Sequence, residues 1–216
     1  MATTNSSREA ILGDIRQTLK RNPESPVAPR PDIVPPRTTG NPNAELEKLL
    51  QEITALKGVV QRLEPIALPN ALAELVKAEN IHKATLWDTA RLTRLGIEAR
   101  LLKLGVEIIP HTADKQEMAT ADLGVTEADF ALPETGTLGL FSSPDQPRSV
   151  SLLPRVHLVI LHPGALRADL HQVFAEAKTQ GYLILITGPS RTSDIELIVT
   201  IGVHGPQQLY VWVVND

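Results

Sequence analysis

Apolar residues first recur at helical spacing near the start of the chain. Ile11, Ile15 and Leu19 are spaced four residues apart, so we expect an amphipathic helix over residues 7–21 with Ser7 available as its N-cap. Seven prolines follow between positions 23 and 42, and proline favours extended backbone without a ladder of hydrogen bonds. We therefore predict an N-terminal helix and proline-rich linker over residues 1–43. The helix either packs on its own domain or binds a partner, and the sequence leaves both open.

The folded domain is expected over residues 44–216. Its first signal is a stripe of apolar residues between Leu46 and Val60 that keeps a helical period. Helical and strand-like patterns then follow one another, and Gly105 is placed to end one of the helices. The expected elements are a short strand around 66–68, a helix over 69–79, a strand over 84–87, a helix over 97–104 and a strand over 106–109.

Denser signals mark the second half of the domain. Two short apolar segments, 128–132 and 137–141, flank the turn at 133–136 and suggest a hairpin. The run 156–161 is almost entirely apolar, as expected of a strand covered on both faces. A helix over 165–179, a second buried strand over 182–187 and a last strand over 208–214 complete the pattern. Strands alternating with helices predict a three-layer α/β fold, with a mainly parallel sheet and helices on both faces.

Composition narrows the classes of function. Hydrophobic and charged residues make up 42% and 21% of the chain, which is typical of a globular protein. Aromatic residues make up only 3%, and the formal net charge is -4, so we expect no binding to nucleic acid or to anionic membranes. The apolar runs are far shorter than the ~20 residues that cross a bilayer. The first eight residues also lack the features of a signal peptide. We expect a soluble, cytoplasmic protein.

The sequence contains no cysteine, so it offers no thiolate for an iron–sulfur cluster, a structural zinc ion or nucleophilic catalysis. Four histidines, His111, His157, His162 and His171, have neither the spacing nor the neighbouring carboxylates of a metal site. We therefore predict no bound metal and no bound cofactor. Any iron–sulfur cluster would belong to a partner protein.

The first candidate binding site is the segment 188–196, which follows a predicted buried strand. Sheets of α/β proteins place ligands at the carboxyl ends of their strands. Gly188 would let the backbone approach a ligand, Ser190 and Thr192 offer hydroxyl groups, and Arg191 matches a carboxylate or phosphate. Alternatively the hydroxyl residues cap a helix, Asp194 complements its positive end and Arg191 forms a structural ion pair. The functional interpretation predicts a small anionic ligand.

A second candidate is the polar turn Glu134-Thr135-Gly136-Thr137. Its backbone amides could face the same cleft as the arginine segment, and Glu134 could be a general acid or base, or a nucleophile. Glu134 could equally serve only to stabilise the turn. His204, in a Gly-Pro turn, is either a contact to a substrate carboxylate or a turn residue without a function.

Asp129 has a structural role in the predicted fold. We expect it near the sheet, paired with Arg148 or Arg191 so that it orders the loops.

Three segments carry a resemblance to a known family: 124–138 (GVTEADFALPETGTL), 151–154 (SLLP), and 186–196 (ITGPSRTSDIE) together with 202–206 (GVHGP). They resemble the LUD domain family, of the lactate-utilisation protein C type. The resemblance implies the fold of ribose-5-phosphate isomerase and the CoA transferases. It also implies a role in growth on L-lactate, within a system that includes cysteine-rich iron–sulfur proteins.

Our leading functional hypothesis is therefore a substrate-handling or accessory component of iron–sulfur-dependent oxidation of L-lactate to pyruvate. The alternatives are a stand-alone enzyme of transferase, isomerase or ligase type that uses Glu134, and an anion-binding module. The sequence does not determine the reaction, the ligand or the oligomeric state.

Overall fold

The computed structural model describes residues 4–20, 37–38, 40–177, 181–193, 199–202 and 204–215. The chain divides into two compact units, residues 1–35 and 36–216. In the first unit α1 spans Thr4–Thr18 and leaves the side chains of Ile11 and Ile15 exposed. Helix α1 begins before Ser7, so the prediction that Ser7 is its N-cap is wrong. Among the helices described in either unit, none is long and apolar enough to cross a membrane.

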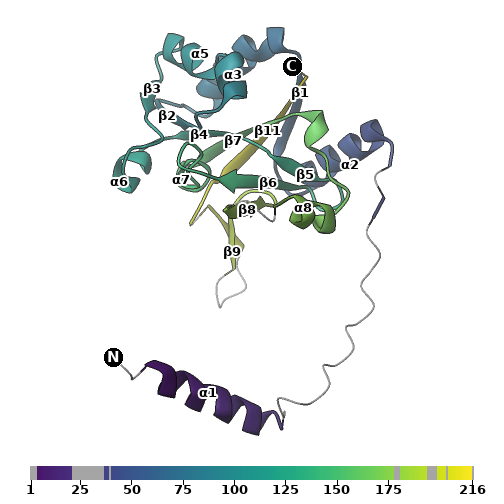
Figure 1. Cartoon of the computed structure of the whole chain (residues 1–216). Coiled ribbons are helices and arrows are strands. Elements are labelled where there is room, and N and C mark those ends of the chain that lie inside the picture. The colour runs from purple at the N-terminus through teal and green to yellow at the C-terminus, as the bar shows by residue number, and fades with distance from the viewer. Residues whose placement is uncertain are drawn as a thin grey trace. The chain divides into compact units, whose positions relative to one another are not determined.

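A six-stranded, wholly parallel sheet forms the centre of the second unit (Figure 1). The strand order is β1-β11-β7-β4-β2-β3. Strands β7 and β11 coincide with the predicted runs, and every residue of β7 is buried. The strands are β1 Val59–Leu63, β2 Lys83–Leu86, β3 Glu107–Ile109, β4 Leu123–Glu127, β7 Val156–Leu161 and β11 Gln208–Val214.

The sheet has a topological switch point between β2 and β4. From β2 the chain passes through α4 (Ala90–Arg94) and α5 (Ile97–Lys103) to β3 on one side. From β4 it proceeds to β7 and then β11 on the other side. Connections that leave neighbouring strands in opposite directions open a crevice at the carboxyl ends of those strands, where α/β proteins bind ligands.

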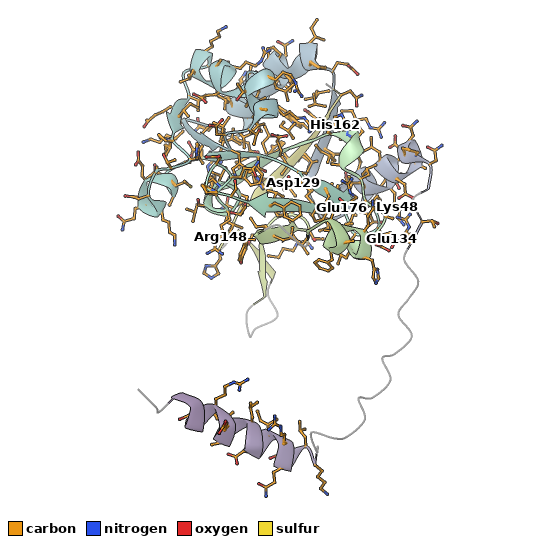
Figure 2. All side chains as sticks on the ribbon, viewed as in Figure 1. Lys48, Asp129, Glu134, Arg148, His162 and Glu176 are labelled. Carbon is orange, nitrogen blue, oxygen red and sulfur yellow. The ribbon has the colours of Figure 1, made fainter. Side chains whose placement is uncertain are left out.

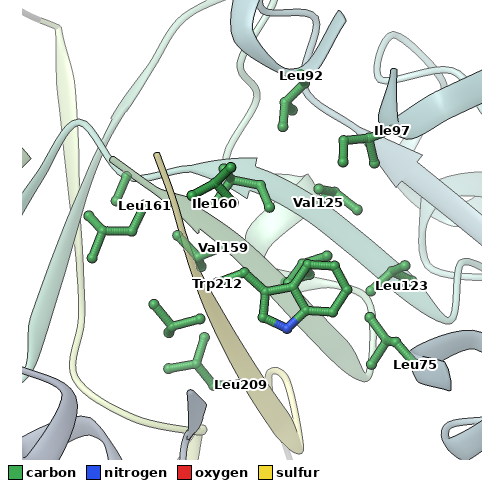
Figure 3. Close-up of a cluster of buried hydrophobic side chains, with 14 of the residues drawn as sticks. Leu75, Leu92, Ile97, Leu123, Val125, Val159, Ile160, Leu161, Leu209 and Trp212 are labelled. Atoms are coloured by element: carbon green, nitrogen blue, oxygen red, sulfur yellow. The ribbon is translucent and has the colours of Figure 1, made fainter. Parts of the chain in front are cut away.

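Helices α3 (Leu68–Ala78) and α5 cover one face of the sheet. Figure 3 shows Trp212 of β11 packed among Leu75 of α3, Leu123 of β4 and neighbouring side chains, all of them buried. The other face packs against α7 (Ser149–Leu152) so closely that a Cβ atom on Gly124 would lie 1.9 Å from the Val150 carbonyl oxygen. The three-layer α/β arrangement is thereby confirmed.

A smaller antiparallel sheet, in the order β5-β6-β8, adds to the second face (Figure 1). Its strands are β5 Phe130–Leu132, β6 Thr137–Ser142 and β8 Tyr182–Ile186, so the predicted hairpin is confirmed. Helix α8 (Leu170–Glu176) packs Val173 against Phe130 and Leu132 of this sheet. The remaining elements are α2 Pro42–Ala55, α6 Lys115–Met118, the 3-10 turns Pro65–Ala67 and Pro163–Ala165, and the hairpin β9 Arg191–Ser193 with β10 Val199–Ile201.

Several element predictions are corrected. Helix α2 ends at Ala55, and Val59 and Val60 belong to β1, because the chain turns at Lys57 and Gly58. Residues 66–68 form a 3-10 turn and the start of α3, so the predicted strand there is wrong. Strand β8 is only half-buried and antiparallel, since it joins the smaller sheet. The helix predicted over 165–179 is shorter, because Asp169 caps α8.

Candidate functional site

A polar cavity of about 300 Å³ lies at the carboxyl ends of β4 and β7, beside the switch point. Glu127 is the last residue of β4, His162 follows β7 directly, and Arg91 comes from α4 after β2. Three parallel strands therefore direct ionisable groups to one place, the arrangement typical of a ligand site in an α/β sheet. The polar and charged lining residues are Arg91, Glu127, Asp129, Gln146, His162 and Arg167.

Glu127 is held from two directions. The hydroxyl of Thr89, the N-cap of α4, donates a hydrogen bond to Glu127 Oε1. The Nη1 atom of Arg91 lies 3.5 Å from Glu127 Oε2. The side chain of Glu127 is 16% exposed, so the carboxylate is largely withdrawn from solvent while its orientation is fixed. It thereby links the end of β4 to the first turn of α4.

Asp129 lines the cavity with a carboxyl group whose pKa is raised. Its Oδ2 accepts a hydrogen bond of 2.7 Å from the Phe141 N–H, and its own N–H donates to the Gly139 carbonyl. Although Asp129 is exposed by surface area, desolvation of its carboxyl by the surrounding residues raises the pKa of Asp129; the negative charge of Glu127 adds to this effect, while the Phe141 N–H opposes it. A carboxyl group with a raised pKa in a cavity is a candidate for proton transfer.

The predicted pairing of Asp129 with Arg148 or Arg191 is not what the structure shows. The Arg148 guanidinium lies over the Tyr182 ring, 4.9 Å from the ring centroid, and Arg191 donates to the Leu56 carbonyl. Both arginines are engaged elsewhere, and Asp129 is ordered by backbone groups of β6 instead.

His162 and Arg167 also line the cavity. The Nδ1 atom of His162 accepts a hydrogen bond of 3.0 Å from the Gly164 N–H, which places the proton of the neutral ring on Nε2. Arg167 Nε contacts both carboxylate oxygens of Glu176, at 3.0 and 2.8 Å, and its Nη1 donates to the Gly164 and Leu166 carbonyls. Both side chains are therefore oriented by the turn after β7.

Glu134, the predicted catalytic residue, lies outside this cavity. Its carboxylate is 53% exposed and contacts Lys48 Nζ at 3.4 Å and Arg37 Nε at 3.3 Å. Figure 2 shows Glu134 beside Lys48, in a different part of the molecule from Asp129 and His162. Arg37 also contacts Glu45 of α2 at 2.7 Å. These ion pairs attach the segment that precedes α2 to the turn between β5 and β6.

The glycines and the arginine of the predicted site contact α2. A Cβ on Gly136 would lie 2.9 Å from the Ile53 nitrogen, and one on Gly188 would lie 3.0 Å from Leu56 Cβ. Both glycines also have positive φ, +63° and +83°. Arg191 Nη2 donates a 2.6 Å hydrogen bond to the carbonyl of Leu56, the C-cap of α2. Each of these features is accounted for by the docking of α2 on the smaller sheet.

The predicted polar turn contacts Thr187, the residue just before the arginine segment. Thr137 Oγ1 lies 2.7 Å from Thr135 Oγ1 and 2.9 Å from Thr187 Oγ1, so the turn after β5 and the end of β8 are bonded together. The Ser190 N–H donates to the Pro206 carbonyl, which brings the His204 turn beside the arginine segment. Thr192 is described only by its place in β9, and Asp194 lies outside the described residues.

The segment 188–191 was expected at the carboxyl ends of the sheet, and this expectation is wrong. Leu56 precedes β1, and the Gln207 N–H, just before β11, bonds to the Arg155 carbonyl, just before β7. Gly188 and Arg191 therefore lie at the amino ends of the parallel strands. The reason is that β8 belongs to the antiparallel sheet, so its end does not point toward the carboxyl edge of the larger one.

The polar cavity was missed because β4 was not predicted. Without that strand, Glu127 has no special position in the sequence. His162 had a usable signal, since it follows the correctly predicted strand 156–161, but it was considered only as a metal ligand. Among the described residues no group of three or more His, Asp or Glu side chains is placed to hold a metal ion.

Comparisons of the chain with family models and with known proteins agree on one family. The LUD domain family model matches residues 46–214. A protein named Lactate utilization protein C from Shouchella clausii is 28% identical over 225 residues, which cover 97% of this chain and 98% of that protein. The protein of the same name from a Geobacillus strain is 31% identical over 169 residues, 70% of each chain.

A solved structure supports the fold. The crystal structure of a DUF162 family protein from Deinococcus radiodurans superposes with a TM-score of 0.60 and 21% identity, and the match covers 82% of this chain and 100% of that one. At this identity the likeness concerns the fold alone.

Proposed function

The chain belongs to the LUD domain family, and from this premise we propose that it is a substrate-handling component of L-lactate utilisation. We propose further that it binds L-lactate, or its oxidation product pyruvate, in the cavity formed by Arg91, Asp129, His162 and Arg167. The observation that carries this proposal is the convergence of these groups at the carboxyl ends of β4 and β7. The names of relatives aligned over nearly the whole chain support the pathway.

The cavity suits a small hydroxy acid in size and in polarity. Its volume of about 300 Å³ is at the lower end of the range of small-molecule sites. The guanidinium groups of Arg91 and Arg167, which also contact Glu127 and Glu176, match the carboxylate of the ligand. His162 and Asp129 offer a hydrogen-bond donor and an acceptor, which the neighbouring hydroxyl or carbonyl of the ligand requires.

The chemistry of the reaction suggests that substrate binding and electron transfer belong to different proteins. Oxidation of L-lactate to pyruvate releases two electrons and two protons. Asp129 and His162 can accept protons, but amino-acid side chains of these types do not take up a pair of electrons. The sequence has no cysteine to ligate an iron–sulfur cluster, so we assign the electrons to separate, cysteine-rich iron–sulfur proteins. This chain would bind and orient the substrate for them.

The alternative of a stand-alone enzyme that uses Glu134 has no comparable support. Glu134 is exposed and engaged by Lys48 and Arg37, and the glycine beside it is accounted for by packing against α2.

Isothermal titration of the full chain with L-lactate and with pyruvate tests the proposal. The Arg167→Gln variant should bind the ligand ~10-fold more weakly or worse, because a hydrogen bond to a charged group contributes about 1.5–3 kcal/mol. Arg62→Gln is the matched control, since Arg62 forms an exposed ion pair with Glu47 of α2, outside the cavity. If neither ligand bound, or if both variants bound like the unmodified chain, the cavity would not be the substrate site.

A further inference from the structure

A second, larger cavity of about 580 Å³ lies at the carboxyl ends of β2 and β3. The segment 87–93 separates it from the polar cavity: Trp87, Leu92 and Thr93 line the larger cavity, while Arg91 lines the smaller one. The two cavities therefore lie on either side of α4 and share its residues. Nothing in the proposed role in lactate utilisation requires the larger one.

The floor of this cavity is apolar. Trp87, Leu92 and Ile109 are buried at its base, and Leu102 of α5 is 53% exposed at its side. The Trp87 ring is fixed in place, because its Nε1 donates a 3.0 Å hydrogen bond to the Pro147 carbonyl. A cavity of this size with an apolar floor and few polar groups has the general character of a site for an organic molecule.

The charged groups at the opening of the cavity indicate which kind of molecule it would bind. Asp88 and Glu98 are exposed at the cavity and both carry carboxylates, whereas the residues that line it include no lysine or arginine. Thr93 and His111 complete the polar part of the lining. A ligand carboxylate would be repelled by these two acids, and an ammonium group would be attracted.

From this arrangement we propose that the larger cavity is a second binding site, which takes an organic amine with an apolar body. The apolar part occupies the floor beside Trp87 and Leu92, and the ammonium group faces Asp88 and Glu98. The site is distinct from the polar cavity, which holds Arg91 and Arg167 together with Glu127 and Asp129 and to which the proposed function assigns an anion. The chain would then bind two ligands of opposite charge.

Three probes of similar shape and different charge test this proposal: 2-phenylethylamine, 3-phenylpropan-1-ol and 3-phenylpropionate. Binding to the full chain is followed by titration calorimetry and by tryptophan fluorescence. Trp87 lines the cavity, whereas Trp212, the other tryptophan of the chain, lies in the core between the sheet and α3 (Figure 3). A ligand in the cavity should therefore change the emission of Trp87.

The amine should bind ~10-fold more tightly than the acid, with the alcohol between them, because two exposed carboxylates each contribute a modest attraction or repulsion. The double variant Asp88→Asn, Glu98→Gln should reduce this preference to about twofold or less. Glu74→Gln, which changes an exposed carboxylate of α3 outside the cavity, should leave the preference unchanged.

Two results would overturn the proposal. The first is saturable binding of the acid as tight as that of the amine, or an amine preference that persists in the double variant. The second is the absence of saturable binding by all three probes, with unchanged Trp87 emission. Loss of lactate binding in the Arg167→Gln variant bears on the other cavity only, so the two proposals succeed or fail separately.

Discussion

Protonation of His157, a buried residue of β7, provides a test of the core. The side chain is 1% exposed, and its Nε2 lies 2.9 Å from the Thr126 hydroxyl of β4. Within the described part of the chain Nδ1 has no hydrogen-bond partner. Burial lowers the pKa of His157 to about 3 in the folded protein. We predict that this one histidine makes folding sensitive to mild acid, and that His157→Gln removes that sensitivity.

The sign and the size follow from linkage. The unfolded chain takes up a proton on His157 as the pH falls below ~6.5, whereas the folded protein does not until about pH 3, so stability is lost on acidification. Between pH 7.5 and pH 5 the expected loss is about 2 kcal/mol, at ~1.4 kcal/mol for each pH unit between the two pKa values. A folded pKa one unit higher would leave this figure nearly unchanged, because pH 5 would still lie above it.

Urea unfolding at pH 7.5 and pH 5 measures the effect as a difference between variants. The unmodified chain should lose about 2 kcal/mol more of its free energy of unfolding than His157→Gln does. His82→Gln is the control, because the exposed side chain of His82 remains in solvent on folding. If His157→Gln does not fold, the NMR signals of His157 in the unmodified chain replace it and should show a neutral ring at pH 5. Equal pH dependence in both chains, or a charged ring at pH 5, would refute the reasoning.

Three further predictions concern packing and the two ends of the sheet. Gly124→Ala should lower the free energy of unfolding by about 3 kcal/mol in urea unfolding, because its Cβ would overlap the Val150 carbonyl. Gly181→Ala, whose Cβ would make an ordinary van der Waals contact 3.9 Å from the Ser142 carbonyl oxygen, should change it by less than about 0.5 kcal/mol. Asp129→Asn should raise the melting temperature at pH 7, because the raised pKa means that the ionised carboxylate destabilises the fold. The difference in melting temperature between the two chains should shrink as the pH falls toward ~3.9, the pKa of an unfolded aspartate. Arg191→Gln should leave the Kd for L-lactate within about twofold in calorimetry, because Arg191 is at the amino end of the sheet and an interaction so distant adds little.

The apolar patterns of the sequence predicted the strands that are apolar along most of their length. Strands β7 and β11 matched their predicted bounds because each is apolar along most of its length, apart from His157 in β7 and Gln208 at the start of β11, which leaves few alternatives. Strand β4 escaped prediction because Gly124, Thr126 and Glu127 break its apolar run, although Gly124 and Thr126 are fully enclosed by packing that the sequence does not reveal.

The position of the predicted binding segments in the fold was misjudged for a related reason. The glycine- and threonine-rich segments of the family motif look like ligand loops, but Gly136 and Gly188 are required for close packing against α2. The cavity instead uses single residues, Arg91, Asp129 and Arg167, that come from separate elements. Their convergence depends on the order of the strands, and the order of strands in a parallel sheet is not written in local patterns.

The most direct test of the proposed function is growth of a strain that lacks this gene on L-lactate as the sole carbon source, compared with growth on pyruvate. We predict a defect specific to L-lactate, which the unmodified gene and Arg191→Gln restore to normal growth and Arg167→Gln does not. Normal growth of the deletion strain on L-lactate would contradict the assignment to lactate utilisation. Restoration by Arg167→Gln but not by Arg191→Gln would place the functional site at the amino end of the sheet instead of in the polar cavity.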